Sequence, residues 1–118
     1  MVTIAKTICL LAMVGALSAC AVGKGMKLAV HCQTDEALAT LSEAEKGSGL
    51  TAQLAILEHE AVLREAGRTK EAEAVRAKRE SRPGMTEKDK AEAEKAILDT
   101  VENIRKEREK ETGSPLCK

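Results

Sequence analysis

The chain of 118 residues contains no Phe, Tyr or Trp. Aromatic side chains are the surfaces on which proteins stack the bases of single-stranded nucleic acid. They also anchor the centres of tight protein interfaces. Their absence argues against a single-stranded nucleic-acid binder, and it leaves only aliphatic side chains and alanine to fill a core.

An excess of charge of either sign is also missing. The chain carries 19 basic and 19 acidic residues, so its formal net charge is zero. No long-range field therefore attracts nucleic acid or an anionic membrane. The sequence also has no Gly-rich phosphate loop, no nucleophile elbow and no acid pair that differs from its Glu/Lys background. We expect no enzyme, no catalytic residues, no cofactor and no small-molecule substrate.

No apolar run is long enough to span a bilayer, which requires about 20 residues. The longest run, residues 8–17 (ICLLAMVGAL), follows Lys6, and polarity returns by Lys24. A basic residue before an apolar stretch of about ten residues is typical of a secretory signal peptide. The chain is therefore expected to be exported.

The end of this run, Leu17-Ser18-Ala19-Cys20, resembles the lipobox of bacterial lipoproteins: a branched aliphatic residue, two small residues and a cysteine. The resemblance implies that residues 1–19 are removed and that Cys20 receives diacylglycerol and a further fatty acid such as palmitate. Several acyl chains hold a protein on a membrane effectively permanently, since each buried methylene adds about 0.8 kcal/mol. Ordinary secretion and an uncleaved anchor are the alternative interpretations.

Ala21 follows the lipobox cysteine. In the sorting rule of enteric lipoproteins, Asp at this position retains the protein in the inner membrane. The resemblance therefore implies the periplasmic face of the outer membrane, with the inner membrane as the alternative.

The rest of the chain predicts an all-α fold, a small bundle of about four short antiparallel helices. Residues 20–33 are interpreted as the lipidated N-terminus and a tether, residues 34–112 as the helical domain and residues 113–118 as a C-terminal tail. Apolar residues recur at helical spacing between Gly and Pro breaks. The four helices are expected at about 34–46, 50–66, 70–81 and 87–112.

Residue types at the breaks predict how these helices begin and end. Thr34 or Asp35 and Thr69 are candidate N-caps, and Thr86 with Asp89 resembles a capping box. Gly67 and Gly113 fit the left-handed position that follows a helix.

Large aliphatic residues are scarce in the predicted third helix, where only Val75 is present. Each buried side chain of this kind contributes about 1.5–3 kcal/mol, whereas ordering the backbone costs about 1–2 kcal/mol per residue. The core is therefore expected to be thin and the third helix its weakest part. Such a domain requires a covalent staple, a partner or both.

The segment from Leu63 to Ala74 resembles the central turn of a tetratricopeptide repeat. Gly67 would close its first helix, and Glu71-Ala72 would open the packing face of its second. The pattern is broken at four positions where the family has apolar or small residues, namely His59, Glu60, Arg76 and Arg79. Because about three copies are needed to bury a continuous core and only one is present, we expect an ordinary αα-hairpin.

The four cysteines reduce to two in the predicted mature protein. Cys9 would leave with the signal peptide and Cys20 would carry lipid, which leaves Cys32 and Cys117 at the two ends of the helical domain. The first and last ends of four antiparallel helices lie on the same side, so a Cα separation suited to a disulfide is plausible. We predict an intramolecular disulfide; an intermolecular bridge and two free thiols are the alternatives.

A zinc site is the other interpretation of these residues, since His31, Cys32, His59 and Cys117 could supply two Cys and two His ligands. Zinc motifs normally contain short-spaced ligand pairs, and the adjacent His31-Cys32 is not such a pair. We expect no metal, and we expect His59 to be a partly exposed helix residue.

The predicted function is that of a lipid-anchored periplasmic protein that acts by binding another envelope protein and contacts the membrane through acyl chains on Cys20. Two alternatives differ in class. One is a passive structural component of the envelope, and the other is an immunity-like lipoprotein that excludes incoming plasmids or phages.

Overall fold

The computed structural model describes the backbone from Gly15 to Cys117 and the side chains from Val22 to Cys117. The predicted all-α class is confirmed, and the described residues contain no strand. The five helices are α2 (Gly15–Val30), α3 (Thr34–Glu45), α4 (Gly49–Glu65), α5 (Thr69–Glu80) and α6 (Glu87–Thr112). The four predicted helices correspond to α3 to α6, and α2 is an additional one.

Helix α2 corrects the prediction of a tether over residues 20–33. Most of that segment is helical and part of the core, with Val22, Ala29 and Val30 buried. Their spacing of seven and eight residues places them on one face of a helix. The Gly and Lys residues between them resemble a linker in composition, but the apolar stripe determines the structure.

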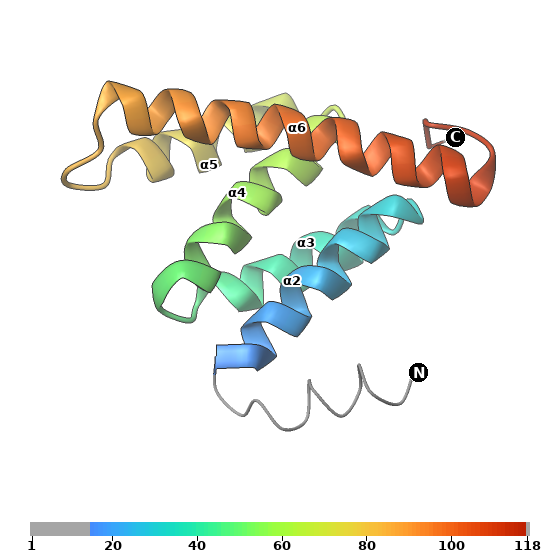
Figure 1. Cartoon of the computed structure of the whole chain (residues 1–118), viewed down its shortest axis with the longest axis horizontal. Helices are drawn as coiled ribbons and strands as arrows, with labels where there is room; N and C mark the ends of the chain where they lie inside the picture. The colour runs from blue at the N-terminus through green and yellow to red at the C-terminus, as the bar shows by residue number, and fades with distance from the viewer. Residues whose placement is uncertain (1–14, 118) are drawn as a thin grey trace.

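The first three helices form one layer of the molecule. Helix α3 runs antiparallel to α2 and α4, and it packs against both (Figure 1). Ala37, Leu38, Leu41 and Ala44 form its buried face. Gly25 of α2 meets this face so closely that a Cβ atom there would lie 2.8 Å from Cγ of Leu41. This glycine is needed for the close approach of α2 and α3.

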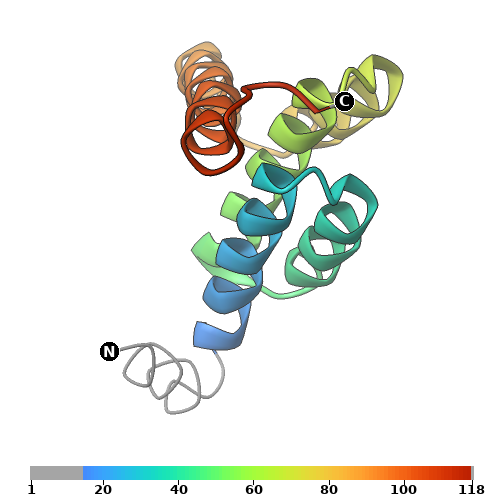
Figure 2. The same cartoon turned by 90° about the vertical axis from the view of Figure 1, so that its right-hand side faces the viewer.

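Helix α4 connects this layer to the second half of the molecule. It packs against α2, α3, α5 and α6, and α5 and α6 lie across its C-terminal part (Figures 1 and 2). Ile97 and Ile104 of α6 are almost completely buried, as are Ala61 and Leu63 of α4. The N-terminal turns of α4 extend away from α5 and α6.

Some predicted helix ends are confirmed. The Thr86 hydroxyl accepts a hydrogen bond from the backbone N–H of Asp89, whose carboxylate accepts one from the N–H of Thr86. Gly67 and Gly113 have φ angles of 77° and 84° and occupy the left-handed region. The breaks in the sequence therefore locate the ends of α4 and α6 correctly.

The predicted side-chain caps of α3 and α5 are wrong. The N-cap positions are Gln33 and Arg68, and neither makes a capping hydrogen bond with its side chain. Thr34 and Thr69 are instead the first residues of their helices. Each helix begins one residue earlier than the cap pattern predicts, because the carbonyls of Gln33 and Arg68 accept the first helical hydrogen bonds.

No helix within the described residues is both long and apolar enough to cross a membrane. Most of the predicted signal peptide, residues 1–14, lies outside the described part of the chain.

Candidate functional site

A disulfide holds one end of the molecule together. Cys32 and Cys117 lie at disulfide distance, with their Sγ atoms 2.09 Å apart and their Cα atoms 5.7 Å apart. Cys32 has a φ angle of 64°, in the left-handed region where a residue with a Cβ atom is destabilised by about 1–2 kcal/mol. The predicted pair thus joins the turn after α2 to the tail after α6.

Arg108 of α6 supports the same end and is only 1% exposed. Its guanidinium donates to the backbone carbonyls of Ala29 (2.8 Å) and Val30 (3.0 Å), at the C-terminal end of α2. It also donates to the carbonyl of Pro115 (2.9 Å) and to the carboxylate of Glu65 (2.5 Å). A cation at this position satisfies carbonyls that have no partner within the helix and complements the helix dipole.

Sequence analysis missed Arg108 because it stands in a run of charged residues, Arg105 to Glu111, of the kind that usually faces solvent. Its position relative to Ile97 and Ile104 was the available signal. These three residues lie on one helical stripe, since their spacings are seven and four residues. The structure buries all three.

The two histidines contact different carboxylates. His31 contacts Glu111 of α6 at 2.8 Å near the disulfide, and His59 of α4 contacts Glu45 of α3 at 2.5 Å. The His59 side chain is 17% exposed, so the prediction of a partly exposed helix residue is confirmed. No group of three or more His, Cys, Asp or Glu side chains in the described part of the chain is arranged to hold a metal ion.

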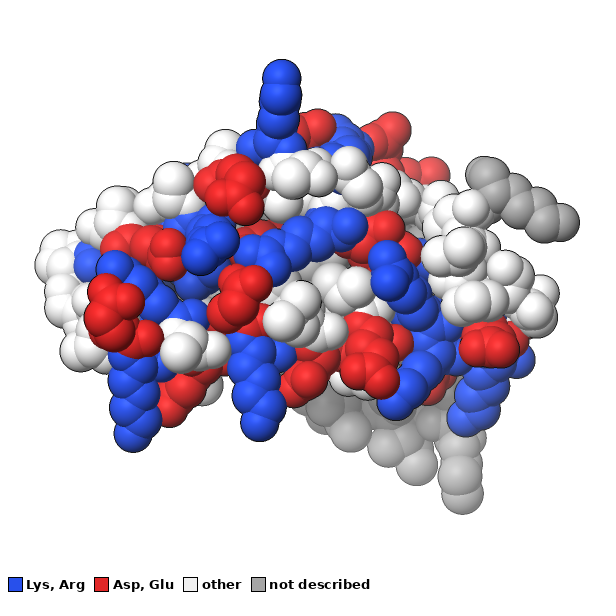
Figure 3. Space-filling view, turned by 90° about the horizontal axis from the view of Figure 1, so that it is seen from above, with Lys and Arg blue, Asp and Glu red and all other residues white. Residues whose placement is uncertain are grey.

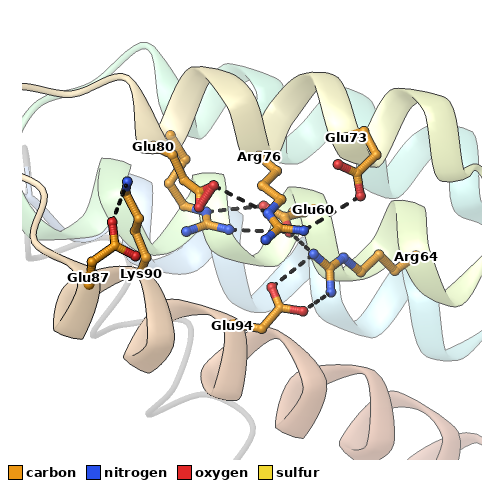
Figure 4. Close-up of polar contacts among 9 residues, drawn as sticks. Glu60, Arg64, Glu73, Arg76, Glu80, Glu87, Lys90 and Glu94 are labelled. Atoms are coloured by element: carbon orange, nitrogen blue, oxygen red, sulfur yellow. Dashed lines mark hydrogen bonds and ion pairs between the residues drawn. The ribbon is translucent and has the colours of Figure 1, made fainter.

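A buried network of ion pairs joins α4 to α5 and α6 (Figure 4). Glu60 is completely buried and accepts hydrogen bonds from Arg79 of α5, the shortest at 3.1 Å. Arg64 lies 2.6 Å from Glu60 and forms two hydrogen bonds with Glu94 of α6, at 2.6 and 3.0 Å. The hydrogen bonds that Arg64 donates hold the pKa of the Glu94 carboxyl below its usual value, and the same bonds raise the pKa of the Arg64 guanidinium.

This network explains two departures from the tetratricopeptide pattern. Glu60 and Arg79 each occupy a position where the family has an apolar or small residue, and here they contact each other between α4 and α5. An acidic and a basic residue thus replace one packing contact of the expected αα-hairpin. A single-residue comparison with the family pattern could not reveal that the two changes compensate each other.

A cavity of about 460 Å³ lies between α4, the α5–α6 connection and α6. Its volume is within the range of ligand sites, about 300–1,000 Å³. The apolar lining consists of Ile56 and Leu57 of α4, Met85 of the connection, and Ala93 and Ala96 of α6. The polar lining consists of Gln53, Arg79, Arg82, Asp89 and Glu92. We call this site the α4–α6 groove.

The lining of the α4–α6 groove is chemically mixed. It combines aliphatic surface with charges of both signs. Such a lining fits an aliphatic surface that has charged residues along its edges.

The surface over α5 and α6 differs from the groove. Basic and acidic side chains alternate over this face, and neither sign dominates (Figure 3). Most of its ion pairs join residues three or four apart on the same helix, such as Arg76 with Glu80 and Lys106 with Glu102. Pairs of this kind contribute little to stability or recognition, so this face is a solvated surface.

Two leucines of α4 remain in contact with solvent. Leu50 and Leu54 are 82% and 45% exposed. Leu50, Leu54 and Ala61 are spaced to share one face of α4, and only Ala61 of the three is buried in the core. Leu98 of α6, 54% exposed, is a separate apolar residue outside the groove lining.

Burial perturbs one carboxyl group strongly. The pKa of Glu58 in α4 is raised to about 7 because burial penalises the charged form. Its Oε2 atom has no hydrogen-bond partner among the described residues, and the same holds for Nη1 of Arg79. Glu58 does not line the α4–α6 groove, so the perturbed carboxyl is a property of the helix interface.

No family model matches this chain. Comparison with curated proteins and with solved structures likewise finds no significant similarity. The backbone of Cys20 lies in α2, and its side chain lies outside the described set. Lipidation of Cys20 therefore remains a prediction from the lipobox resemblance.

Proposed function

We propose that this chain is a lipid-anchored periplasmic protein of the outer membrane that binds another envelope protein through the α4–α6 groove. Cys20 carries the acyl chains, and the groove presents the binding surface. The observation that carries the proposal is an open aliphatic cavity of about 460 Å³ in a domain with few large apolar residues.

The shape and chemistry of the groove favour a helical segment of the partner. Two helices, α4 and α6, form its walls, and a third helix can lie between them by the same side-chain packing that joins helices in a core. Amphipathic helices bind such grooves through aliphatic residues three, four and seven positions apart. Arg82 of the α5–α6 connection and Asp89 and Glu92 of α6 add charged groups of both signs to the lining.

The test is photo-crosslinking in native membranes. A photoreactive residue in place of Gln53, which lines the groove, is expected to crosslink one protein stoichiometrically. The same residue in place of Lys78, an exposed position on α5, is the control and is expected to give no product.

A matched pair of substitutions adds a second measurement. Ala96→Arg places a large cation in the groove lining, whereas Ala77→Arg adds the same side chain at an exposed position of α5 outside the lining. Only Ala96→Arg is expected to abolish the crosslink. If Gln53 yields no partner in a protein that is acylated and folded, the proposal fails and a passive structural role replaces it.

A further inference from the structure

The exposed leucines of α4 lie at the same end of the molecule as the beginning of α2. Helices α2 and α4 run in the same direction, and α3, which lies between them in the chain, runs antiparallel to both (Figures 1 and 2). The start of α2, the α3–α4 connection and the start of α4 therefore share one end. We call this end, with Leu50 and Leu54, the α4 leucine end.

The absence of a tether fixes the distance between the predicted lipid site and this end. Cys20 lies in α2 only two residues before Val22, which is 6% exposed and belongs to the core. Gly25, one turn further, packs directly on Leu41 of α3. Acyl chains on Cys20 would therefore hold the folded domain itself against the bilayer, with no flexible linker between them.

The side chains around this end suit a lipid surface. Leu50 is 82% exposed, which is unusual for a large aliphatic residue, and Leu54 is one helical turn further along α4. Lys24 is exposed four residues after Cys20 in α2, and Lys46 of the α3–α4 connection has a 71% exposed side chain that also contacts Glu43. Aliphatic residues flanked by lysines are typical of segments that lie at the boundary of headgroups and acyl chains.

We infer that Leu50 and Leu54 insert into the bilayer surface when Cys20 is acylated, and that this contact sets the orientation of the domain. The inference rests on the proposed function, because it requires the lipid anchor. The first lining residue of the α4–α6 groove along α4 is Gln53, three residues beyond Leu50, and three residues of helix rise only about 4.5 Å. The groove would open close to the membrane, where a partner's juxtamembrane helix can reach it.

The complete absence of Trp makes the test direct, because one introduced Trp is the only such fluorophore in the chain. The acylated full-length product carrying Leu50→Trp is reconstituted into phosphatidylethanolamine and phosphatidylglycerol vesicles that contain brominated acyl chains. Lys78→Trp, at an exposed position of α5 in the second half of the molecule, is the matched control. Leu54→Trp provides a second probe of the same end.

The expected result is a blue-shifted emission and at least a twofold loss of fluorescence for Leu50→Trp and Leu54→Trp, with no quenching for Lys78→Trp. Equal emission from all three variants in a protein whose mass shows the acyl chains would overturn the membrane contact. That result leaves the lipid anchor and the groove intact. A mass without acyl chains would overturn the anchor as well, so the two failures are distinguishable.

Discussion

The two ends of α6 are stabilised in opposite ways. Its C-terminal end contacts the disulfide between Cys32 and Cys117 through the tail, and Arg108 there binds four acceptors from three other segments. Its N-terminal end borders the α4–α6 groove and the short α5, in which only Ala72 and Arg79 are buried. The C-terminal end of α6 is held by the disulfide and by the Arg108 hydrogen bonds, whereas its N-terminal end borders the open groove.

The composition of the core explains why the disulfide end is needed for stability. Of the 15 buried hydrophobic residues of the described chain, seven are alanines: residues 29, 37, 44, 52, 55, 61 and 72. Alanine allows helices to approach closely but buries little area, and burial contributes about 25 cal/mol per Å² of apolar surface. The chain therefore relies on the disulfide end for stability and can leave aliphatic side chains exposed in the groove.

The largest expected effect comes from removing the crosslink. The disulfide closes a loop with a sequence separation of 85 residues. In the chain-entropy account, a loop of this length contributes about 4–5 kcal/mol. The double substitution Cys32→Ser and Cys117→Ser should unfold most of the protein or shift its urea midpoint strongly, as measured by circular dichroism.

Chemical reduction of the natural chain is the control for this substitution. It should reproduce the shift of the double variant, because both break the same bond. A monomer in non-reducing electrophoresis with two alkylatable thiols, or a disulfide-linked dimer, would contradict the intramolecular pair.

The next effect should come from Arg108→Leu. Removing one partner of a buried ion pair costs about 3–5 kcal/mol, and the change would remove the Arg108 hydrogen bonds to Glu65 and to three backbone carbonyls. We expect a loss of about 3 kcal/mol in the free energy of unfolding, measured in urea. Arg105→Leu, on the same helix and 3.5 Å from Glu65 with a 45% exposed side chain, should change stability by less than about 1 kcal/mol.

A third comparison asks whether α2 belongs to the folded core. Gly25→Ala would place a Cβ atom 2.8 Å from Leu41, and overpacking of this kind costs about 1–3 kcal/mol. Gly23→Ala meets nothing within 4 Å and should be neutral or stabilising by about 0.5–1 kcal/mol. Equal thermal shifts for the two variants would mean that α2 does not pack against α3 in solution.

Sequence analysis predicted the second half of the fold better than the first. The breaks at Gly67 and Gly113 and the capping box at Thr86 are local signals, so the ends of α4 and α6 could be located. The segment before Cys32 was misread because its Gly and Lys residues outweigh a short apolar stripe. Only the tertiary contact of Gly25 with Leu41 reveals the role of that stripe.

Of the two candidate sites, the disulfide could be predicted from the sequence and the groove could not. The pairing of Cys32 with Cys117 could be predicted from their positions at the two ends of the domain, and the structure confirms it at disulfide distance. The groove could not be predicted, because Leu57 and Ala96 are 39 residues apart and ordinary in composition. Its existence depends on how α6 crosses α4, and no local pattern encodes a crossing.

The smallest expected effect concerns Glu58, whose pKa burial raises from the ordinary value of 4.5 to about 7. Between these two values the folded protein binds more protons than the unfolded chain, so stability falls as pH rises from about 5 to 7. Because part of the side chain remains exposed, we expect a loss of only about 1–2 kcal/mol across this interval. Glu94 titrates in the opposite sense, since its pKa is lowered and its contribution to stability is lost at a lower pH.

Glu58→Gln should remove this fall in stability with rising pH, whereas Glu109→Gln, at an exposed position of α6, should keep it. Urea titrations of the three proteins at pH 5 and pH 8 measure the difference, and an unchanged slope in Glu58→Gln would show that another group titrates in this range.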